Sequence, residues 1–111
     1  MSKNARVTRR AHVRIPAKLT MIDESHHAAH TLDLSQGGVS LQTETQLRLA
    51  QYCAVSFKVD LGAGSHTVLA MGQVVYSDPD AELGFKTGVQ FIKLDQGSAA
   101  TINELLDAPQ D

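Results

Sequence analysis

Apolar and polar residues alternate along the first third of the chain. Between residues 13 and 21 every second position is apolar: Val13, Ile15, Ala17, Leu19 and Met21. A period of two is typical of a strand with one buried face, so the pattern predicts a strand over residues 12–22. Pro16 lies on the polar set of positions and lacks the N–H that a strand ladder uses, which indicates an edge or a bulge there.

Five further strands follow from the same alternation and from apolar runs bounded by turn residues. Their predicted ranges are 27–34, 39–43, 52–61, 66–76 and 85–94. Turns are expected at 23–26, 36–38, 62–65 and 77–80, a loop or a single helical turn at 44–50, and a loop at 81–83. The first two strands are expected to form a hairpin. Gly72 inside the fifth range suggests a bulge or a bend.

One stretch has helical rather than strand spacing. Residues 99–107 place Ile102, Leu105 and Leu106 on one helical face, which predicts a C-terminal helix that caps or flanks the sheet. Six strands in so short a chain favour a small barrel. The predicted fold class is therefore mostly β, a six-stranded antiparallel β-barrel with a C-terminal α-helix.

A length of 111 residues fits one domain with a single core. We expect a flexible basic arm over residues 1–8, one domain over 9–107 and a tail over 108–111. The single cysteine, Cys53, has no partner for an internal disulfide and lies in an apolar stretch, so we expect it to be buried. With no secretory signal or membrane span visible, the expected location is the cytoplasm, with no membrane partner.

The net charge of -2 conceals an uneven distribution of charge along the chain. Residues 1–22 carry six basic residues and no carboxylate, whereas all 12 acidic residues lie from Asp23 onward. A compact anion would be attracted to the basic end.

Two short runs near that end carry candidate binding chemistry. The first, residues 9–14, holds Arg9, Arg10 and Arg14 with no carboxylate near them in sequence. The second, residues 33–38, holds Asp33, Ser35, Gly37 and Gly38. Clustered guanidiniums need an anionic partner or solvent, and a glycine pair lets the backbone turn sharply or approach another group closely. We therefore expect the two runs to form one anion-binding site.

These runs resemble the motifs of the PilZ domain, a bacterial family of small barrels that bind the second messenger cyclic di-GMP. Arg10 and Arg14 match the family pattern Arg-x-x-x-Arg, and Asp33, Ser35 and Gly38 match Asp/Asn-x-Ser-x-x-Gly. The stretches 72–76 and 88–91 also resemble later family features, so the resemblance covers about residues 8–94. Either motif alone is weak, but the two together, in order, on a six-stranded chain are specific.

The resemblance implies a cyclic di-GMP receptor or effector that changes conformation on binding and signals to a partner protein or an attached domain. It implies no enzymatic activity and no cofactor. The expected ligand-binding residues are Arg9, Arg10, Arg14, Asp33, Ser35, Gly37 and Gly38. In this family a basic residue at the position of Arg9 tends to accompany a stacked dimer of the nucleotide.

The chemistry of the side chains assigns roles within that expectation. An arginine fork binds phosphate oxygens, faces guanine O6 and N7, and stacks on a base. Arg10 and Arg14 are four residues apart, which in an extended segment places both side chains on one face. Asp33 and Ser35 are expected to share a strand face, with Asp33 accepting from a guanine N–H rather than meeting a phosphate.

Other interpretations stay open at this point. The arginines could form surface ion pairs with acids such as Asp33, and residues 33–38 could be an ordinary capped turn. A PilZ-like adaptor that binds a protein without nucleotide is a second class. A nucleic-acid-binding barrel is a third, disfavoured because aromatic residues make up only 5% of the chain.

Metal binding and catalysis find little support in the sequence. His26, His27 and His30 have no Cys, Asp or Glu at ligand spacing to complete a metal site. Ser35 is not surrounded by a nucleophile elbow, so we expect neither a metal nor a catalytic residue.

Overall fold

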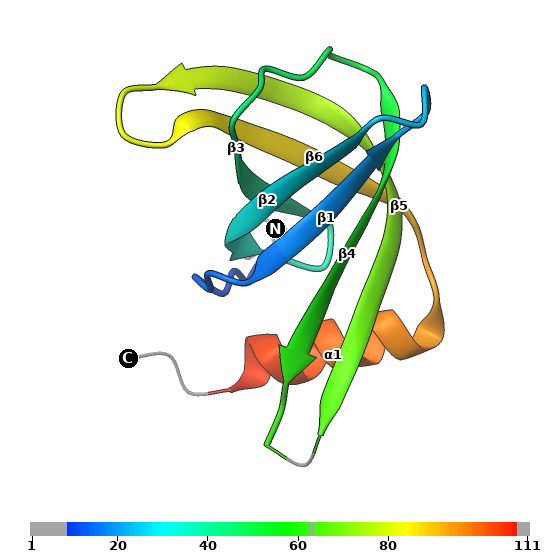
Figure 1. Ribbon diagram of the computed structural model, residues 1–111. Helices are drawn as coiled ribbons and strands as arrows, with labels where there is room; N and C mark the ends of the chain where they lie inside the picture. Colours follow the sequence, from blue (N-terminus) through cyan, green and yellow to red (C-terminus); the bar gives the residue numbers. More distant parts are fainter. Residues whose placement is uncertain (1–8, 63, 109–111) are drawn as a thin grey trace, which may run out of the picture.

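The computed structural model describes residues 9–62 and 64–108 of the chain (Figure 1). The elements in these residues are β1 (Pro16–Met21), β2 (His26–Leu34), β3 (Gly38–Thr43), β4 (Tyr52–Asp60), β5 (Ser65–Asp80), β6 (Gly84–Leu94) and α1 (Gln96–Asp107). The strands close into a barrel in the order β1-β2-β3-β6-β5-β4, and every neighbouring pair is antiparallel. The predicted fold class is confirmed. The expected arm, residues 1–8, lies outside the described residues.

The core fills the inside of the barrel with alternate residues of the strands. Leu19 of β1, Leu41 of β3, Val55 of β4 and Val68 of β5 are fully buried. Burying each such side chain contributes roughly 1.5–3 kcal/mol. The alternate residues of β4, from Cys53 to Val59, are buried. Burial raises the pKa of the Cys53 thiol to about 11, so it packs as a neutral, apolar side chain.

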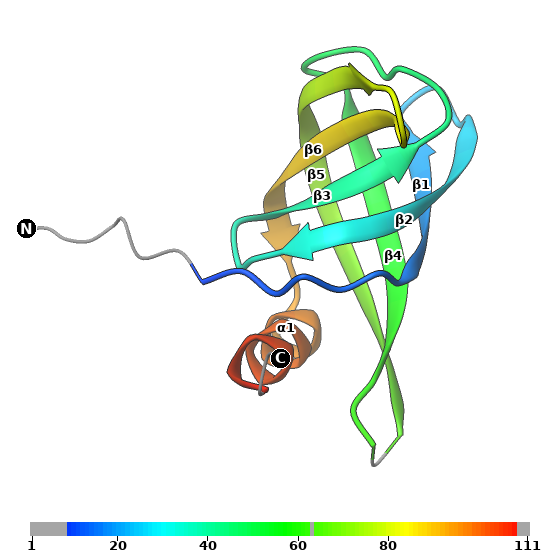
Figure 2. The same ribbon diagram turned by 90° about the vertical axis from the view of Figure 1, so that its left-hand side faces the viewer.

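α1 lies below the barrel in Figures 1 and 2 and packs against β5. It begins at Gln96, earlier than the sequence predicts, because the Asp95 carboxylate accepts a hydrogen bond from the Ser98 N–H at 2.6 Å and caps the helix. Ile102 is fully buried, as its spacing predicted. The Ser98 hydroxyl accepts from the Leu69 N–H at 3.0 Å, which ties α1 to β5.

The first strand is shorter than the alternation predicts. Residues 12–15 are extended but bond to Thr31 outside a regular ladder: the Thr31 N–H donates to Ile15 O, and the Ile15 N–H donates to Thr31 Oγ1. β1 begins only at Pro16. β1 is not an edge strand, because the barrel is closed. Pro16 itself pairs only with β2, since pairing with β4 begins at Ala17, and a missing N–H is tolerated at this first position of the strand.

The predicted turn over residues 77–80 is wrong, because β5 continues to Asp80. Its last part pairs with β6, as in Asp78↔Lys86 and Pro79↔Phe85. The pairing between β4 and β5 ends at Gln73. Beyond Gln73 the edge of β5 that faces away from β6 has no ladder partner, so Pro79 fits there without loss of a hydrogen bond. The predicted bulge at Gly72 is confirmed by a register shift between Met71 and Gly72.

Three hydroxyl groups form a buried chain inside the barrel. Thr87 Oγ1 lies 2.9 Å from both Thr43 Oγ1 and Ser77 Oγ. The two outer hydroxyls are also bonded to backbone: Thr43 Oγ1 donates to Thr45 O, and Ser77 Oγ accepts from the Leu47 N–H. The chain links β3, β5 and β6 and fixes the loop before β4.

We expect Thr87→Val to destabilise the fold by about 1–3 kcal/mol, because it removes the central hydroxyl and leaves a buried partner unsatisfied at nearly constant volume. Urea unfolding followed by circular dichroism measures this change. Thr67→Val, at an exposed position of β5, is the matched control and should leave the midpoint unchanged. Equal unfolding midpoints for the two variants would contradict a stabilising role of the three buried hydroxyl groups.

Candidate functional site

A backbone pair brings the two sequence runs together. The Ala11 N–H donates to Leu34 O at 2.8 Å, and the Leu34 N–H donates to Ala11 O at 2.9 Å. Both side chains are fully buried in the core. In this antiparallel pair Arg10 and Asp33 are diagonal neighbours, a separation that the long arginine side chain can span.

Arg10 and Asp33 form an ion pair at that position. Arg10 Nη1 donates to Asp33 Oδ1 at 2.8 Å. The Arg10 side chain is 55% exposed and that of Asp33 is 13% exposed, so the carboxylate is largely enclosed while the guanidinium faces solvent. The guanidinium has five N–H donors, and this contact uses one of them.

The turn after Asp33 is held by its own hydrogen bonds. The Ser35 hydroxyl accepts from the Gly37 N–H at 3.2 Å, and the Ser35 N–H donates to Gly38 O at 2.9 Å. Ser35 is buried and lies one residue beyond the end of β2. Gly38 is required by close packing, since a Cβ there would lie 2.4 Å from Val89 O.

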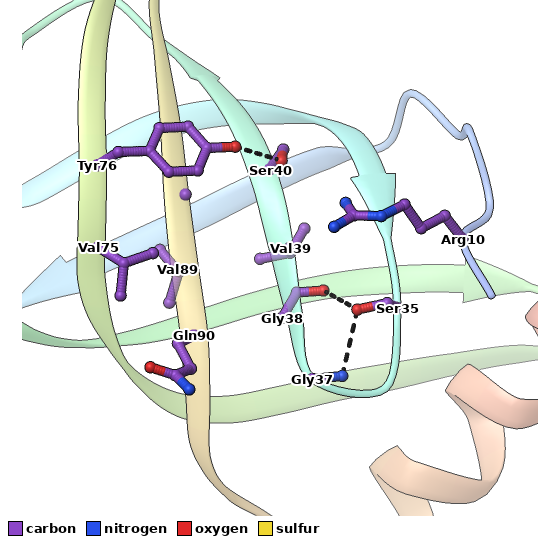
Figure 3. Close-up of a pocket in the computed structure, with 11 residues that line it drawn as sticks. Arg10, Ser35, Gly37, Gly38, Val39, Ser40, Val75, Tyr76, Val89 and Gln90 are labelled. Atoms are coloured by element: carbon purple, nitrogen blue, oxygen red, sulfur yellow. Dashed lines mark hydrogen bonds between the residues drawn. The ribbon is translucent and has the colours of Figure 1, made fainter. Parts of the chain in front are cut away.

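A pocket of about 320 Å³ opens beside this turn (Figure 3). Arg10 and Ser35 lie on one side of it, and Val75, Tyr76 and Gln90 lie on the opposite side. Its volume is at the low end of the range of roughly 300–1,000 Å³ for small-molecule sites. The pocket therefore joins the Arg10–Asp33 region to the outer surface of β3, β5 and β6.

Tyr76 is the aromatic residue of the pocket, and the sequence analysis did not assign it to the site. Its hydroxyl is 2.7 Å from Ser40 Oγ, and its ring lies against Gly88, where a Cβ would fall 2.2 Å from the ring. Tyr76 and Gly88 belong to the stretches 72–76 and 88–91, which already resembled family features. A glycine inside a strand pattern signals a close approach, and here the approaching group is this ring.

Arg14 and Arg9 do not reach this pocket. Arg14 Nη2 donates to Gln42 Oε1 at 2.7 Å and lines a separate pocket of about 240 Å³ with His30 and Glu44. Because Gln42 and Ser40 are two apart on β3, Arg14 lies on the same outer face as the first pocket, one step along it. Arg9 pairs with Asp107 at the end of α1. The structure thus brings together Arg10, Asp33 and the 35–38 turn, with Arg14 adjacent and Arg9 apart.

The described ranges, 9–62 and 64–108, contain no group of three or more His, Cys, Asp or Glu side chains that could hold a metal ion. Two of the three histidines considered above bond to nearby hydroxyls: His26 Nδ1 to Thr20 Oγ1 at 3.2 Å, and His27 Nε2 to Ser25 Oγ at 3.1 Å. In the same part of the chain no helix has the length and apolar character needed to cross a membrane.

Comparison with known proteins identifies the family to which this chain belongs. The family model described as PilZ domain matches residues 4–108, so the chain belongs to the PilZ domain family. PilZ domains are receptor or effector domains rather than enzymes. No curated protein matches the sequence.

Solved structures with this fold include the following three. The inhibitor of motility MotI/DgrA of Bacillus subtilis has a TM-score of 0.78 at 8% identity; the match covers 94% of this chain and 50% of that chain, so this chain spans half the length of MotI. The PilZ domain of CeSA from a cellulose-synthesizing bacterium has a TM-score of 0.55 at 18% identity, with 87% and 93% covered. The PilZ domain of Escherichia coli YcgR, solved with c-di-GMP, has a TM-score of 0.56 at 16% identity, with 90% and 84% covered.

The two glycines at opposite walls of the pocket give a matched test of its packing. Gly88→Ala should displace the Tyr76 ring and destabilise the fold by about 1–3 kcal/mol, because the added methyl overlaps the ring. Gly37→Ala has open space, with Ser35 Oγ 4.0 Å away, and should be close to neutral. Urea unfolding of both variants measures the difference, and equal stability would contradict the packing of Tyr76 on Gly88.

Proposed function

We propose that this chain is a cyclic di-GMP receptor that changes conformation on binding and signals to a partner protein or an attached domain. The observation that carries the proposal is the Ala11–Leu34 backbone pair, which holds Arg10 beside Asp33 at the pocket edge. The presence of c-di-GMP in the YcgR PilZ domain of the same fold supports the choice of ligand.

The arginines supply the charge and the geometry that this ligand needs. Cyclic di-GMP carries two phosphates and two guanines, and an arginine fork can bind either group in a bidentate manner. Arg10 has four N–H donors beyond the one it gives to Asp33. Arg14 lies one step along the same face with a neutral partner, Gln42, which it can release without stranding a buried charge.

Asp33 serves guanine recognition in this proposal. In the described part of the chain its carboxylate is bonded only through Oδ1, to Arg10, which leaves Oδ2 for a guanine N–H. Ser35 is already bonded within the turn, so its role is to hold the Gly37–Gly38 backbone open to the ligand. The Tyr76 ring adds an apolar wall across the pocket.

The proposed conformational change is the loss of the ion pair between Arg9 and Asp107. For Arg9 to reach a phosphate it must leave Asp107, and both side chains are more than half exposed, so the pair is worth roughly 0–1 kcal/mol. A ligand phosphate competes easily with such a pair. Binding would therefore detach the first run from the end of α1 and alter a surface that a partner can detect.

We expect Arg10→Ala and Arg14→Ala each to weaken cyclic di-GMP binding at least about tenfold, a loss of about 1.4 kcal/mol, while the protein stays folded. Isothermal titration calorimetry measures the affinity, and thermal unfolding checks the fold. Arg48→Ala, on the loop between β3 and β4, is the control and should bind as the wild type does.

Unchanged affinity in both Arg10→Ala and Arg14→Ala would show that the nucleotide binds at a site other than this one. A wild-type protein that neither binds the nucleotide nor shifts its melting temperature with it would overturn the proposal in favour of a protein adaptor. Strongly salt-dependent binding of an oligonucleotide in place of the dinucleotide would indicate a nucleic-acid-binding barrel.

The same titration counts nucleotides per chain. If Arg9 holds the second member of a stacked dimer, the wild type binds two nucleotides and Arg9→Ala binds one with the site otherwise intact. Asp107→Ala, which removes the partner of Arg9 and leaves the guanidinium, is the control and should keep two. A stoichiometry of one for the wild type would contradict the stacked dimer without affecting the receptor assignment.

A further inference from the structure

A second surface of the barrel is unlike the rest of the outer wall. It consists of the outward positions of β1 from Lys18 to Thr20, of β4 from Tyr52 to Lys58, and of β5 from Thr67 to Met71, and we call it the β1–β4–β5 face. The registers align these positions in rows: Lys18↔Ser56↔Leu69 and Thr20↔Ala54↔Met71. The three strands run side by side in Figure 1.

The centre of the β1–β4–β5 face is apolar. Tyr52 is 52% exposed, Leu69 51% and Met71 48%, and Ala54 lies between them. Their alternate neighbours, such as Val55 and Ala70, fill the core, so these side chains are not needed inside the barrel. Tyr and Met are enriched in protein interfaces relative to other surfaces, and large apolar side chains grouped on one face mark a contact site.

Two lysines flank a hollow at one end of this face. A pocket of about 470 Å³ is lined by Lys18 and Lys58, by the hydroxyls of Ser56 and Thr67, and by Ile15 and Pro16 among others. Lys18 and Lys58 are diagonal neighbours across β1 and β4, since Lys18 pairs with Ser56. Neither lysine has an ion-pair partner in residues 9–62 and 64–108.

Carboxylates border the β1–β4–β5 face but do not enter it. Asp23 follows β1 and accepts from the Ser25 N–H and hydroxyl, and Asp60 at the end of β4 accepts from the Gly62 N–H. Asp95, before α1, accepts from the Ser98 N–H. Each of these acids caps its own turn or helix, and within residues 9–62 and 64–108 none of them forms an ion pair with Lys18 or Lys58.

The barrel closure decides how a partner can bind here. β4 pairs with β5 along its whole length and with β1 over residues 53–57, so at the apolar centre of the face it offers no free backbone edge to an added strand. Recognition must use side chains: apolar anchors on Leu69 and Met71, and carboxylates beside Lys18 and Lys58. The recess between the lysines suits a discrete side chain, which favours a peptide segment over a flat lipid surface.

We propose that the β1–β4–β5 face docks an acidic, amphipathic segment of a protein partner. Carboxylates of the segment lie between Lys18 and Lys58, and its apolar residues cover Tyr52, Leu69 and Met71. The nucleotide site proposed above uses residues 9–14, the β2–β3 turn, β3, β5 and β6, and β5 is the strand that the two surfaces have in common. The docking surface is therefore separate from that site and is tested without nucleotide.

The test starts from a display library of random 12-residue peptides selected on the immobilised wild-type protein. Enriched peptides are synthesised with a fluorescent label, and their binding is measured by anisotropy. We expect enrichment of Asp and Glu together with Leu, Ile or Phe, and a loss of affinity of about tenfold or more in the charge-reversed Lys18→Glu/Lys58→Glu variant.

Two further variants separate the charge from the apolar contact. Met71→Ser, at an exposed position, should also weaken the peptides, whereas Arg48→Glu, a charge reversal on a loop outside this face, should not. Circular dichroism melting confirms that each variant is folded, and Lys18→Gln/Lys58→Gln serves as the milder replacement if charge reversal unfolds the protein.

Three outcomes would overturn the proposal. The first is peptides without acidic enrichment or with full affinity for the lysine variants. The second is sedimentation of the wild type with phosphatidylserine vesicles that the lysine variants abolish, which would assign the face to a lipid surface. The third is self-association of the wild type by light scattering that Met71→Ser abolishes, which would assign it to a second copy of the chain.

Discussion

Two backbone hydrogen bonds between Ala11 and Leu34 are the constraint on which the binding surface depends. Neither residue carries binding chemistry, and both are fully buried. Because Ala11 is small, the N-terminal segment can lie close against the end of β2 without opening the core. Arg10 is fixed one residue before this contact and Asp33 one residue before its partner. The chemistry of the site is thus positioned by a piece of core packing.

The ion pair between Arg10 and Asp33 is compatible both with a stable surface contact and with a binding site. Asp33 is largely enclosed, and a carboxylate in such a place without a cation would be costly. Arg10 neutralises it and remains 55% exposed, so the pair keeps the guanidinium extended over the pocket rather than collapsed onto the surface. An arginine suits this double task better than a lysine, because its fork can hold one anion while it presents the remaining donors to another.

The fold could be predicted from the sequence because each strand of a barrel buries one face, which makes apolar and polar residues alternate along the chain. The prediction was wrong where residues that usually form turns lie within a strand. Ser77, Asp78 and Pro79 have turn composition, yet Ser77 is buried in the hydroxyl chain with Thr87, and the strand continues through them. Pro79 is tolerated in β5 because the pairing between β4 and β5 ends at Gln73, so no strand on that side needs its missing N–H. Where that pairing ends depends on the order of the strands in the barrel, which a local sequence pattern does not contain.

The candidate site shows the same limit at the level of single side chains. The two motifs identified Arg10, Asp33 and the glycine turn, because the residues of each motif lie close together in the sequence. The partners Gln42 of Arg14 and Asp107 of Arg9 come from β3 and α1, 28 and 98 residues away in sequence. Tyr76 reaches the pocket only because Gly88 on the neighbouring strand leaves room for its ring.

Closing the barrel also explains why two faces remain for binding. Every strand has a partner on each side, so no whole strand is left as an edge, and most contacts come from outward side chains and from the turns at the barrel ends. One such surface gathers guanidiniums beside a glycine turn, and the other gathers apolar side chains beside two lysines. β5 contributes Tyr76 to the first and Leu69 and Met71 to the second, with the Gly72 bulge between them. Because β5 contributes side chains to both candidate surfaces, its irregular pairing at Gly72 is the point along this strand that separates them.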